Sequence, residues 1–336
     1  MNAPGGNRRG PLRITIITPA APGSRTGNRV TALRWAAFLR EGGHRVTVSV
    51  EEHGRPCDLM IALHARRSFP SISRFRQAHP HTPLVLALTG TDLYGDIQKD
   101  PDAQQALELA DALVLLQARG VDELPQRMKG KARVIYQSVQ APQTLPPKIR
   151  RGFEVAVVGH LRPVKDPFLT ERALGALPAH SQIRVVHIGR ALEEAMAGEA
   201  RQKTAVNPRY RWLGGMPRGA CLRRMARSHL LVLSSLSEGG ANVISEAVVC
   251  GLPVLASRVP GNVGMLGDDY PGYFPVGDHV ALAALMSRAE EEPAFLKDLL
   301  AHAKKLAPHF SPATEKEALL RLARDMTPAP AGARAS

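Results

Sequence analysis

The sequence predicts an α/β protein built from two doubly wound parallel-sheet domains. Short, continuously apolar runs rich in β-branched residues alternate with helical patterns along the chain, which is typical of parallel strands covered on both faces. The alternation stops once, at the proline-rich stretch QAPQTLPPKIRRG (140–152), and then starts again. A length of 336 residues accommodates two domains of ordinary size.

In the first half, apolar side chains at helical spacing predict a helix over 28–43, which ends at Gly42 and Gly43. Apolar runs predict strands over 12–20, 44–50, 58–64, 83–92, 111–117 and 131–139. Shorter helices are expected over 71–79, 101–110 and 121–128.

Beyond the proline-rich stretch, a helix is expected to begin near Ala241 and Asn242, and three more helices close the chain over 278–292, 293–307 and 311–326. The strands expected here are 153–161, 182–189, 210–215, 229–235 and 253–257. The predicted organisation is a flexible tail at 1–11, a Rossmann-like domain at 12–139, a linker at 140–152, a second Rossmann-like domain at 153–310, a helix at 311–327 that packs back on the first domain, and a disordered tail at 328–336.

Composition excludes several classes of protein. The formal charge of +14 favours anionic partners in general, but the basic residues are spread along the chain and aromatic residues make up only 4%, so we expect no nucleic-acid partner. No apolar run reaches 18 residues, and the first one is too short for a signal peptide. Three widely separated cysteines fit a reduced cytoplasmic protein. No metal-ligand spacing and no D-x-D at a strand end occurs, so we expect no metal cofactor.

The stretch SEGGANVISEAVVCGLPVLAS (237–257) carries two acidic residues seven positions apart. Glu238 follows a strand, and the two glycines after it allow close backbone approach. Glu246 lies in the second turn of a helix whose free N–H groups suit a phosphate. Since a carboxylate accepts two hydrogen bonds from a vicinal diol, the stretch predicts a nucleotide-sugar site. The spacing alone leaves open the alternative that both are solvated acids at a helix start.

This stretch resembles the E-x7-E segment of retaining glycosyltransferases with the GT-B fold. Two further segments agree in order: VVGHLRPVKDP (157–167), similar to a glycine-rich phosphate turn, and GDHVALAALM (277–286), similar to the helix after the donor site. The resemblance implies two Rossmann-like domains that face each other across a cleft. It also implies a UDP-sugar donor and a reaction without a metal.

Individual roles follow from the same resemblance. It implies that Glu246 holds the ribose diol, that Glu238 lies beside the transferred sugar, and that Lys165 contacts the diphosphate. His160 stands where an arginine is usual, so Arg162 is the further candidate for the diphosphate contact. The predicted catalytic residues are Glu238, Lys165 and Arg162, and the predicted donor-binding residues are Glu246, Gly159, His160, Gly189, Arg190, Leu213, Gly214, Gly239, Gly240, Ala241 and Asn242.

The first half carries arginines, hydroxyls and glycines at strand ends, a composition that suits a second anion. Taken singly, each arginine is better explained as a solvated surface charge. Two clusters in one sheet, however, favour an acceptor site. The predicted acceptor-binding residues are Gly23, Ser24, Arg25, Thr26, Gly27, Asn28 and Arg29 after the first strand, His64, Arg66 and Arg67 after the third, and Thr89, Gly90, Thr91 and Asp92 after the fourth.

Together with GNVGMLGDDYPGYFPVGD (261–278), these segments resemble a narrower group, the selenosugar synthases of selenoneine biosynthesis. That resemblance implies transfer of the sugar of UDP-GlcNAc or UDP-Glc to selenophosphate, with formation of a carbon–selenium bond. It also implies that other enzymes of that pathway are partners. Thr89 stands where many GT-B enzymes have a histidine. A small anionic acceptor would explain the absence of that histidine.

Two other functions stay open from the sequence. One is an ordinary GT-B glycosyltransferase with a lipid-linked or cell-envelope acceptor, whose basic charge serves an anionic membrane surface. The other is a non-catalytic, basic nucleotide-binding or nucleic-acid-binding protein, for which the charge of +14 is the main argument.

Overall fold

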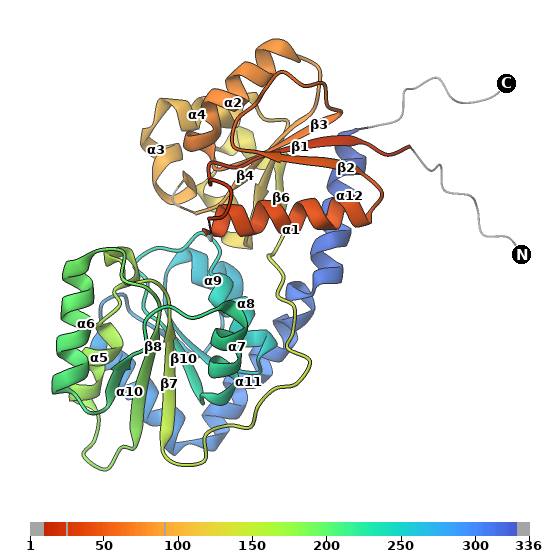
Figure 1. Cartoon of the computed structure of the whole chain (residues 1–336). Coiled ribbons are helices and arrows are strands. Elements are labelled where there is room, and N and C mark those ends of the chain that lie inside the picture. Colours follow the sequence, from red (N-terminus) through yellow and green to blue (C-terminus); the bar gives the residue numbers. More distant parts are fainter. Residues whose placement is uncertain (1–9, 25, 91, 328–336) are drawn as a thin grey trace, which may run out of the picture. The chain divides into compact units, whose positions relative to one another are not determined.

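A computed structural model describes residues 10–24, 26–90 and 92–327 of the chain (Figure 1). The chain divides into two compact units. Unit 1 holds the residues up to Leu116, Val121–Ile135 and the residues from Ala313 onward, and unit 2 holds Gln117–Gly120 and Tyr136–Pro312. The division follows Ile135, four residues before the boundary that the sequence suggested. Residues 136–139 join unit 2, where Val139 donates its N–H to the Phe310 carbonyl at 3.1 Å. The proline-rich stretch contacts the same unit, where Ile149 donates its N–H to the Arg227 carbonyl at 3.0 Å.

Unit 1 contains one six-stranded sheet, sheet A, in the order β2-β1-β3-β4-β5-β6, with all pairs parallel. The strands β3, β4 and β5 are buried at every position, whereas β1 and β2 are partly exposed. The bounds are β1 Arg13–Ile17, β2 Arg45–Ser49, β3 Leu59–Leu63, β4 Leu84–Leu88, β5 Ala112–Leu115 and β6 Ala132–Val134.

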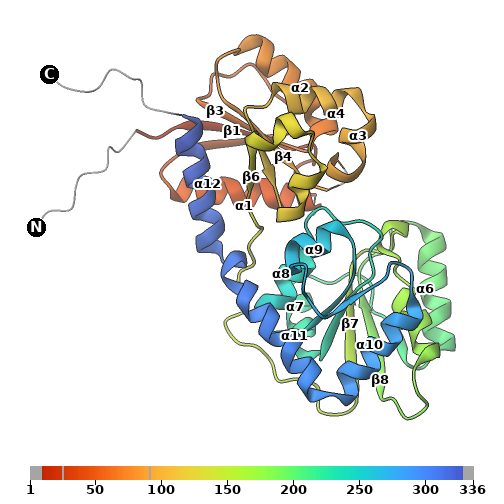
Figure 2. The same cartoon turned by 180° about the vertical axis from the view of Figure 1, so that it is seen from behind.

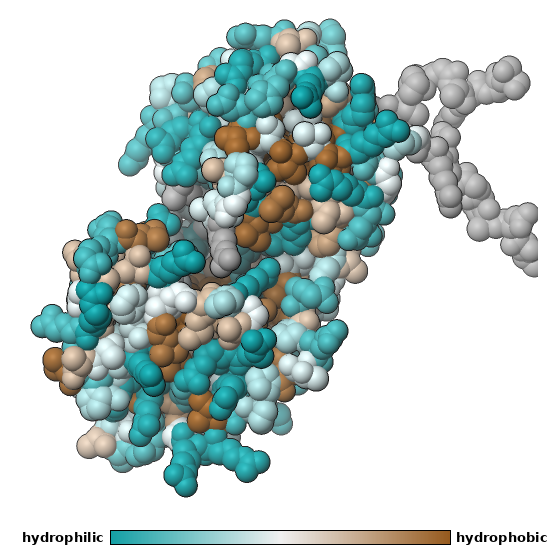
Figure 3. Space-filling model, viewed as in Figure 1, coloured by the Kyte–Doolittle hydropathy of each residue, from teal (hydrophilic) through white to brown (hydrophobic). Residues whose placement is uncertain are grey.

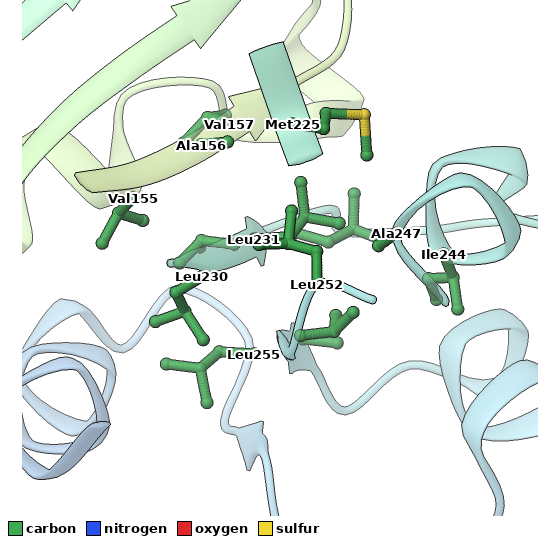
Figure 4. Close-up of a cluster of buried hydrophobic side chains, with 14 of the residues drawn as sticks. Val155, Ala156, Val157, Met225, Leu230, Leu231, Ile244, Ala247, Leu252 and Leu255 are labelled. Atoms are coloured by element: carbon green, nitrogen blue, oxygen red, sulfur yellow. The ribbon is translucent and has the colours of Figure 1, made fainter. Parts of the chain in front are cut away.

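Unit 2 contains a second six-stranded parallel sheet, sheet B, in the order β12-β11-β10-β7-β8-β9. Apolar side chains of β7, β10 and β11 converge with those of α8 in its core, as Figure 4 shows for Leu231, Ala247 and Leu255. The bounds are β7 Phe153–Val158, β8 Ile183–Ile188, β9 Tyr210–Trp212, β10 Leu230–Leu233, β11 Val254–Ser257 and β12 Tyr273–Phe274. The predicted architecture of two doubly wound parallel-sheet domains is therefore confirmed.

Most helices lie between successive strands, whereas α10, α11 and α12 follow the last strand, β12. In unit 1 they are α1 Gly27–Glu41, α2 Ala65–Ala78, α3 Ile97–Lys99, α4 Pro101–Leu109 and α12 Pro312–Met326. In unit 2 they are α5 Leu169–Ala173, α6 Glu194–Val206, α7 Arg218–Arg227, α8 Asn242–Val249, α9 Pro260–Leu266, α10 His279–Glu291 and α11 Pro293–Leu306.

The expected start of the helix at 71 is wrong: α2 begins at Ala65 and includes Pro70. The predicted helix over 121–128 is two short 3-10 segments, Ala118–Glu123 and Gln126–Lys131.

The last helix, α12, belongs to unit 1 and lies beside α1 in both views (Figures 1 and 2). Its Glu315 is 1% exposed and accepts a hydrogen bond of 2.7 Å from the Trp35 indole of α1. The Arg34 guanidinium lies 2.9 Å from the same carboxylate. Leu319 and Leu322 enter the core beside Trp35. A buried carboxylate with an arginine and an indole N–H as partners fixes the helix against α1.

Candidate functional site

The donor-binding residues predicted from the sequence lie at the carboxyl ends of parallel strands in unit 2. In an open parallel sheet, ligands bind at this edge, at the point where the strand order reverses. In sheet B that switch point lies between β7 and β10. The residues follow their strands in this way: Gly159 and His160 after β7, Gly189 and Arg190 after β8, Leu213 and Gly214 after β9, and Glu238, Gly239, Gly240, Ala241 and Asn242 after β10.

Two of the predicted catalytic residues meet at this switch point. Lys165, in the loop after β7, forms an ion pair with Glu238, in the loop after β10. The Ser235 hydroxyl donates a hydrogen bond of 2.6 Å to the same Glu238 oxygen. Glu238 is 8% exposed, so its charge needs these two partners. The structure thereby brings together a cation and a carboxylate that are distant in the sequence.

Backbone contacts hold the two loops together. Leu236 donates its N–H to the Val164 carbonyl at 2.9 Å, and the Ser234 hydroxyl bonds to the Lys165 carbonyl at 3.0 Å. Gly261, at the start of α9, lies so close that an added Cβ would come within 1.8 Å of the Glu238 carbonyl oxygen. The sequence reasoning missed Ser235 and Gly261. The glycine could have been found only through its position after Pro260, which is a common signal of a helix start.

Glu246 lies on α8 and forms an ion pair with Arg218 of α7, whose Nε is 3.2 Å from its carboxylate. Arg218 was not predicted as a site residue. The neighbouring thiols of Cys221 and Cys250 are buried, and burial raises the pKa of Cys221 to about 12 and that of Cys250 to about 11, with the Glu246 charge acting in the same direction. Both thiols are therefore neutral at pH 7.

The ends of β7 and β8 touch through their backbones. A Cβ on Gly189 would lie 1.8 Å from the Gly159 carbonyl oxygen, so only glycine fits. His160 accepts the Arg190 N–H at its Nδ1, at 3.1 Å. Burial and then the nearby charge of Arg190 lower the pKa of His160, with Arg162 and Lys165 adding to the effect, so its imidazole is neutral at pH 7. Arg162 itself is exposed, and its contact with a diphosphate stays a prediction.

Most of the predicted acceptor residues lie at the carboxyl edge of sheet A. Its strand order reverses between β1 and β3, and the loop after β1 and His64 after β3 flank that switch point. Gly23 has a φ of 82°, which favours glycine, and the hydroxyls of Ser24 and Thr26 are 3.3 Å apart. Gly27, Asn28 and Arg29 form the first turn of α1. The predicted residues Arg25 and Thr91 lie outside the described residues.

His64 is buried at the start of α2 with a φ of 76°, a region that bulky side chains rarely adopt. Its Nδ1 accepts the Arg67 N–H at 3.4 Å, and its Nε2 lies 4.0 Å from Asp96. Burial lowers the pKa of His64 more than the nearby Asp92 raises it, so the imidazole is neutral at pH 7. The exposed Arg66 pairs with Asp96 at 3.1 Å. Sequence reasoning missed Asp96.

Asp92 is fully buried and supports the loop after β4. Its carboxylate accepts N–H bonds from Thr89 at 3.0 Å, from Gly90 at 2.8 Å and from Ala65 at 3.0 Å. These bonds tie the end of β4 to the start of α2. Asp92, which was expected among the acceptor-binding residues, is therefore buried beneath this loop and orients the backbone of Thr89 and Gly90.

Within the residues that the structure describes, no group of three His, Cys, Asp or Glu side chains is placed to bind a metal ion. No helix in the described ranges is both long and apolar enough to cross a bilayer.

Comparisons with known proteins agree with this geometry. Residues 147–306 match the family model described as Glycosyl transferases group 1. Glycosyltransferase 1 domain-containing protein 1 of Xenopus tropicalis is 23% identical in an alignment of 330 residues that covers 87% of this chain and 92% of that protein.

Solved structures of similar fold cover nearly the whole chain. HepE from Anabaena in complex with UDP and glucose aligns with a TM-score of 0.71 and 17% identity, over 93% of this chain and 99% of its own. Sucrose-phosphate synthase from Thermosynechococcus elongatus aligns with a TM-score of 0.78 and 15% identity, over 95% and 99%. Residues 147–306 are therefore similar to group 1 glycosyl transferases, and the chain has the GT-B fold, with six parallel strands in each of its two sheets.

Proposed function

We propose that this protein is a selenosugar synthase, which transfers the sugar of UDP-GlcNAc or UDP-Glc to selenophosphate in the cytoplasm and needs no metal. The observation that carries the proposal is the chemistry of the two switch points. One holds the Lys165–Glu238 pair, and the other holds exposed arginines beside a glycine-rich loop. The first suits a nucleotide-sugar, and the second suits a small anion.

On the donor side, Glu246 binds the ribose diol and Glu238 orients hydroxyls of the sugar. Lys165, with Arg162, stabilises the negative charge that grows on the diphosphate as the sugar leaves. Support for a UDP-sugar comes from the similar HepE structures, whose complexes contain UDP with glucose, UDP alone, or UDP-glucose. The ion pair of Lys165 with Glu238 supports a shared position next to the reacting sugar.

On the acceptor side, Arg66, Arg67 and Arg29 hold selenophosphate. Its selenium attacks the anomeric carbon, a carbon–selenium bond forms, and the bond from that carbon to the diphosphate oxygen breaks, so that UDP leaves. Hydrolysis of the phosphorus–selenium bond by water then frees the selenol. Selenium in selenophosphate is already nucleophilic, which fits a site with Thr89 where many GT-B enzymes have a histidine.

Mass spectrometry of the products decides between acceptors. The purified protein is mixed with UDP-GlcNAc or UDP-Glc and selenophosphate, and we expect a selenium-containing sugar together with one equivalent of UDP. The same product in the presence of EDTA would support a metal-independent reaction. Release of UDP without any selenium in the sugar product would contradict the proposal.

A second candidate is transfer to a lipid-linked acceptor, and one observation favours it. Val30 is 38% exposed and Leu33 is 47% exposed on α1, next to Arg29. Figure 3 shows apolar side chains gathered on the face of unit 1 where Figure 1 places α1. An apolar and basic helix face suits an anionic bilayer. Sedimentation with anionic vesicles, and its loss in Leu33→Glu, would favour this candidate.

A further inference from the structure

The end of sheet A that holds β1 and β2 differs from the rest of the sheet in the connection that follows β2. The connection from β2 to β3, residues 50–58, contains no helix (Figure 1), whereas a doubly wound sheet normally has one there. Along the pairing register, Arg13 lies opposite Arg45, and Thr15 lies opposite Thr47. Since side chains two positions apart share a face, these four polar residues lie on one face of the sheet.

A pocket of about 320 Å³ lies on this face, within the size range of about 300–1,000 Å³ that is usual for small-molecule sites. The two strands form one side, and the loop 51–57 forms the other. The lining residues that matter for binding are Arg13, Thr15, Arg45, Thr47, Glu51, Glu52, His53, Arg55 and Cys57. The pocket thus combines cations, hydroxyls and a thiol.

The acidic groups at the pocket already have partners. Arg13 pairs with Asp58 at 2.8 Å, and Glu51 lies 3.8 Å from Arg74. The Glu52 carboxylate accepts the Gly54 N–H. Burial raises the pKa of the Cys57 thiol, so it stays protonated at pH 7.

Two arginines at the pocket, unlike these acidic groups, have no ion-pair partner among the described residues. Arg45 and Arg55 are both exposed. Among the described residues, neither has a carboxylate within ion-pair distance. The pocket therefore has two guanidinium groups that are available to an anion.

We propose that this pocket binds a hydroxylated organic phosphate of the size of a sugar phosphate. Arg45 and Arg55 take the phosphate, because guanidinium groups bind phosphate through paired, charge-assisted hydrogen bonds. The hydroxyls of Thr15 and Thr47 take those of the ligand. Arg13 and Arg45 begin their strands, and Ser49 at the end of β2 also lines the pocket, so the pocket runs along the face of the sheet. The proposed acceptor loops follow β1, β3 and β4 instead, and the proposed ligand is distinct from the donor and the acceptor of the transfer reaction.

The test is calorimetric titration of the full chain, saturated with UDP, with glucose 6-phosphate as the probe. We expect binding that Arg45→Ala and Arg55→Ala each weaken by about ten-fold or more. Arg321→Ala, which removes an exposed arginine of α12, is the matched control and should bind like the wild type. In a parallel NMR titration, the amide signals of Thr15 and Thr47 should shift.

Three results would overturn the proposal. Wild-type affinity in both Arg45→Ala and Arg55→Ala would remove the phosphate from this pocket. Loss of binding in Arg66→Ala alone would assign the probe to the loops at the carboxyl edge. Equal affinity for inorganic phosphate and glucose 6-phosphate would contradict recognition of the sugar hydroxyls.

Discussion

The switch points of the two sheets differ in how their charges are balanced. At sheet B, each predicted carboxylate has a basic partner: Glu238 pairs with Lys165, and Glu246 pairs with Arg218. At sheet A, Arg66 pairs with Asp96, but the Arg29 Nε is buried without a hydrogen-bond partner among the described residues. The predicted carboxylates of sheet B are therefore paired, although Arg162 and Arg190 at the same edge have no ion pair among the described residues. Sheet A combines a paired arginine with one whose Nε has no partner among those residues.

The two regions also share one feature of the backbone. His64 and Asp166 are the non-glycine residues with positive φ in the described ranges, and one lies at each switch point. Backbone strain of this kind is retained where the surrounding structure fixes it, often at functional sites. Each strained residue precedes or follows a predicted binding residue, Arg66 or Lys165. Each edge therefore holds one non-glycine residue with positive φ beside a predicted binding residue.

The largest expected effect comes from Lys165. Lys165→Ala should lower the turnover number by about 100-fold or more, because the charge on the leaving diphosphate loses its stabilising cation. The dissociation constant of UDP should change less, since that charge grows only in the transition state. Steady-state kinetics with selenophosphate, together with UDP calorimetry, measure both quantities. Lys165→Arg should retain part of the turnover, and an unaltered turnover number in Lys165→Ala would move the diphosphate contact elsewhere.

Gly189 tests whether the edge of sheet B depends on close backbone contact. Gly189→Ala should lower the free energy of unfolding by about 3 kcal/mol, because its Cβ would meet the Gly159 carbonyl at 1.8 Å. Urea unfolding measures this. Gly198→Ala is the matched control in α6, where a Cβ meets open space, and it should stabilise the protein by up to about 1 kcal/mol. Equal stability of the two variants would contradict the argument.

Glu246 distinguishes a ribose contact from a structural ion pair. Glu246→Ala should weaken UDP binding by about 1.5–3 kcal/mol, since a charged hydrogen-bond acceptor is lost. Arg218→Ala removes the partner at 3.2 Å and leaves the carboxylate in place, so it should weaken UDP binding less. Calorimetric titration with UDP compares the two variants. If both bind UDP as the wild type does, Glu246 does not belong to the donor site.

Arg66 tests the acceptor role of sheet A. Arg66→Ala should raise the Michaelis constant for selenophosphate by about ten-fold and leave UDP affinity unchanged, because the residue belongs to unit 1. Its side chain is 46% exposed, which limits the effect. Arg127→Ala, whose guanidinium pairs with Glu108 elsewhere in unit 1, is the control. Wild-type acceptor kinetics in Arg66→Ala, Arg67→Ala and Arg29→Ala together would favour a neutral or lipid acceptor.

The last expected effect is on acid stability. Burial lowers the pKa of His187 from 6.5 to about 4, so the unfolded chain binds more protons than the folded one between these two values. The free energy of unfolding therefore falls as the pH drops from 6.5 toward 4 and is unaffected by this group above 6.5. Thermal unfolding of wild type and His187→Gln over this range measures the effect. His187→Gln should show a shallower acid decline, and parallel pH curves would contradict it.

The sequence predicted the two sheets well because continuous apolar runs identify buried parallel strands. The strand expected over 58–64 is β3, Leu59–Leu63, and the one expected over 229–235 contains β10, Leu230–Leu233. Helix starts were less certain. The helix expected over 71–79 begins earlier: α2 starts at Ala65, where Asp92 accepts the first N–H. That acceptor lies 27 residues away and leaves no local signal.

By itself, the sequence determined which groups stand after each strand: glycines, arginines, Lys165, Glu238 and Glu246. Only the tertiary structure decided which of them meet. Lys165 and Glu238 are 73 residues apart, and they form a pair because sheet B places β10 beside β7. The structure likewise placed Asp92 beneath its loop and left Arg45 and Arg55 without acids, as described above. Charge pairing depends on strand order and burial, which arise from the packing of distant segments, whereas local apolar patterning needs only neighbouring residues.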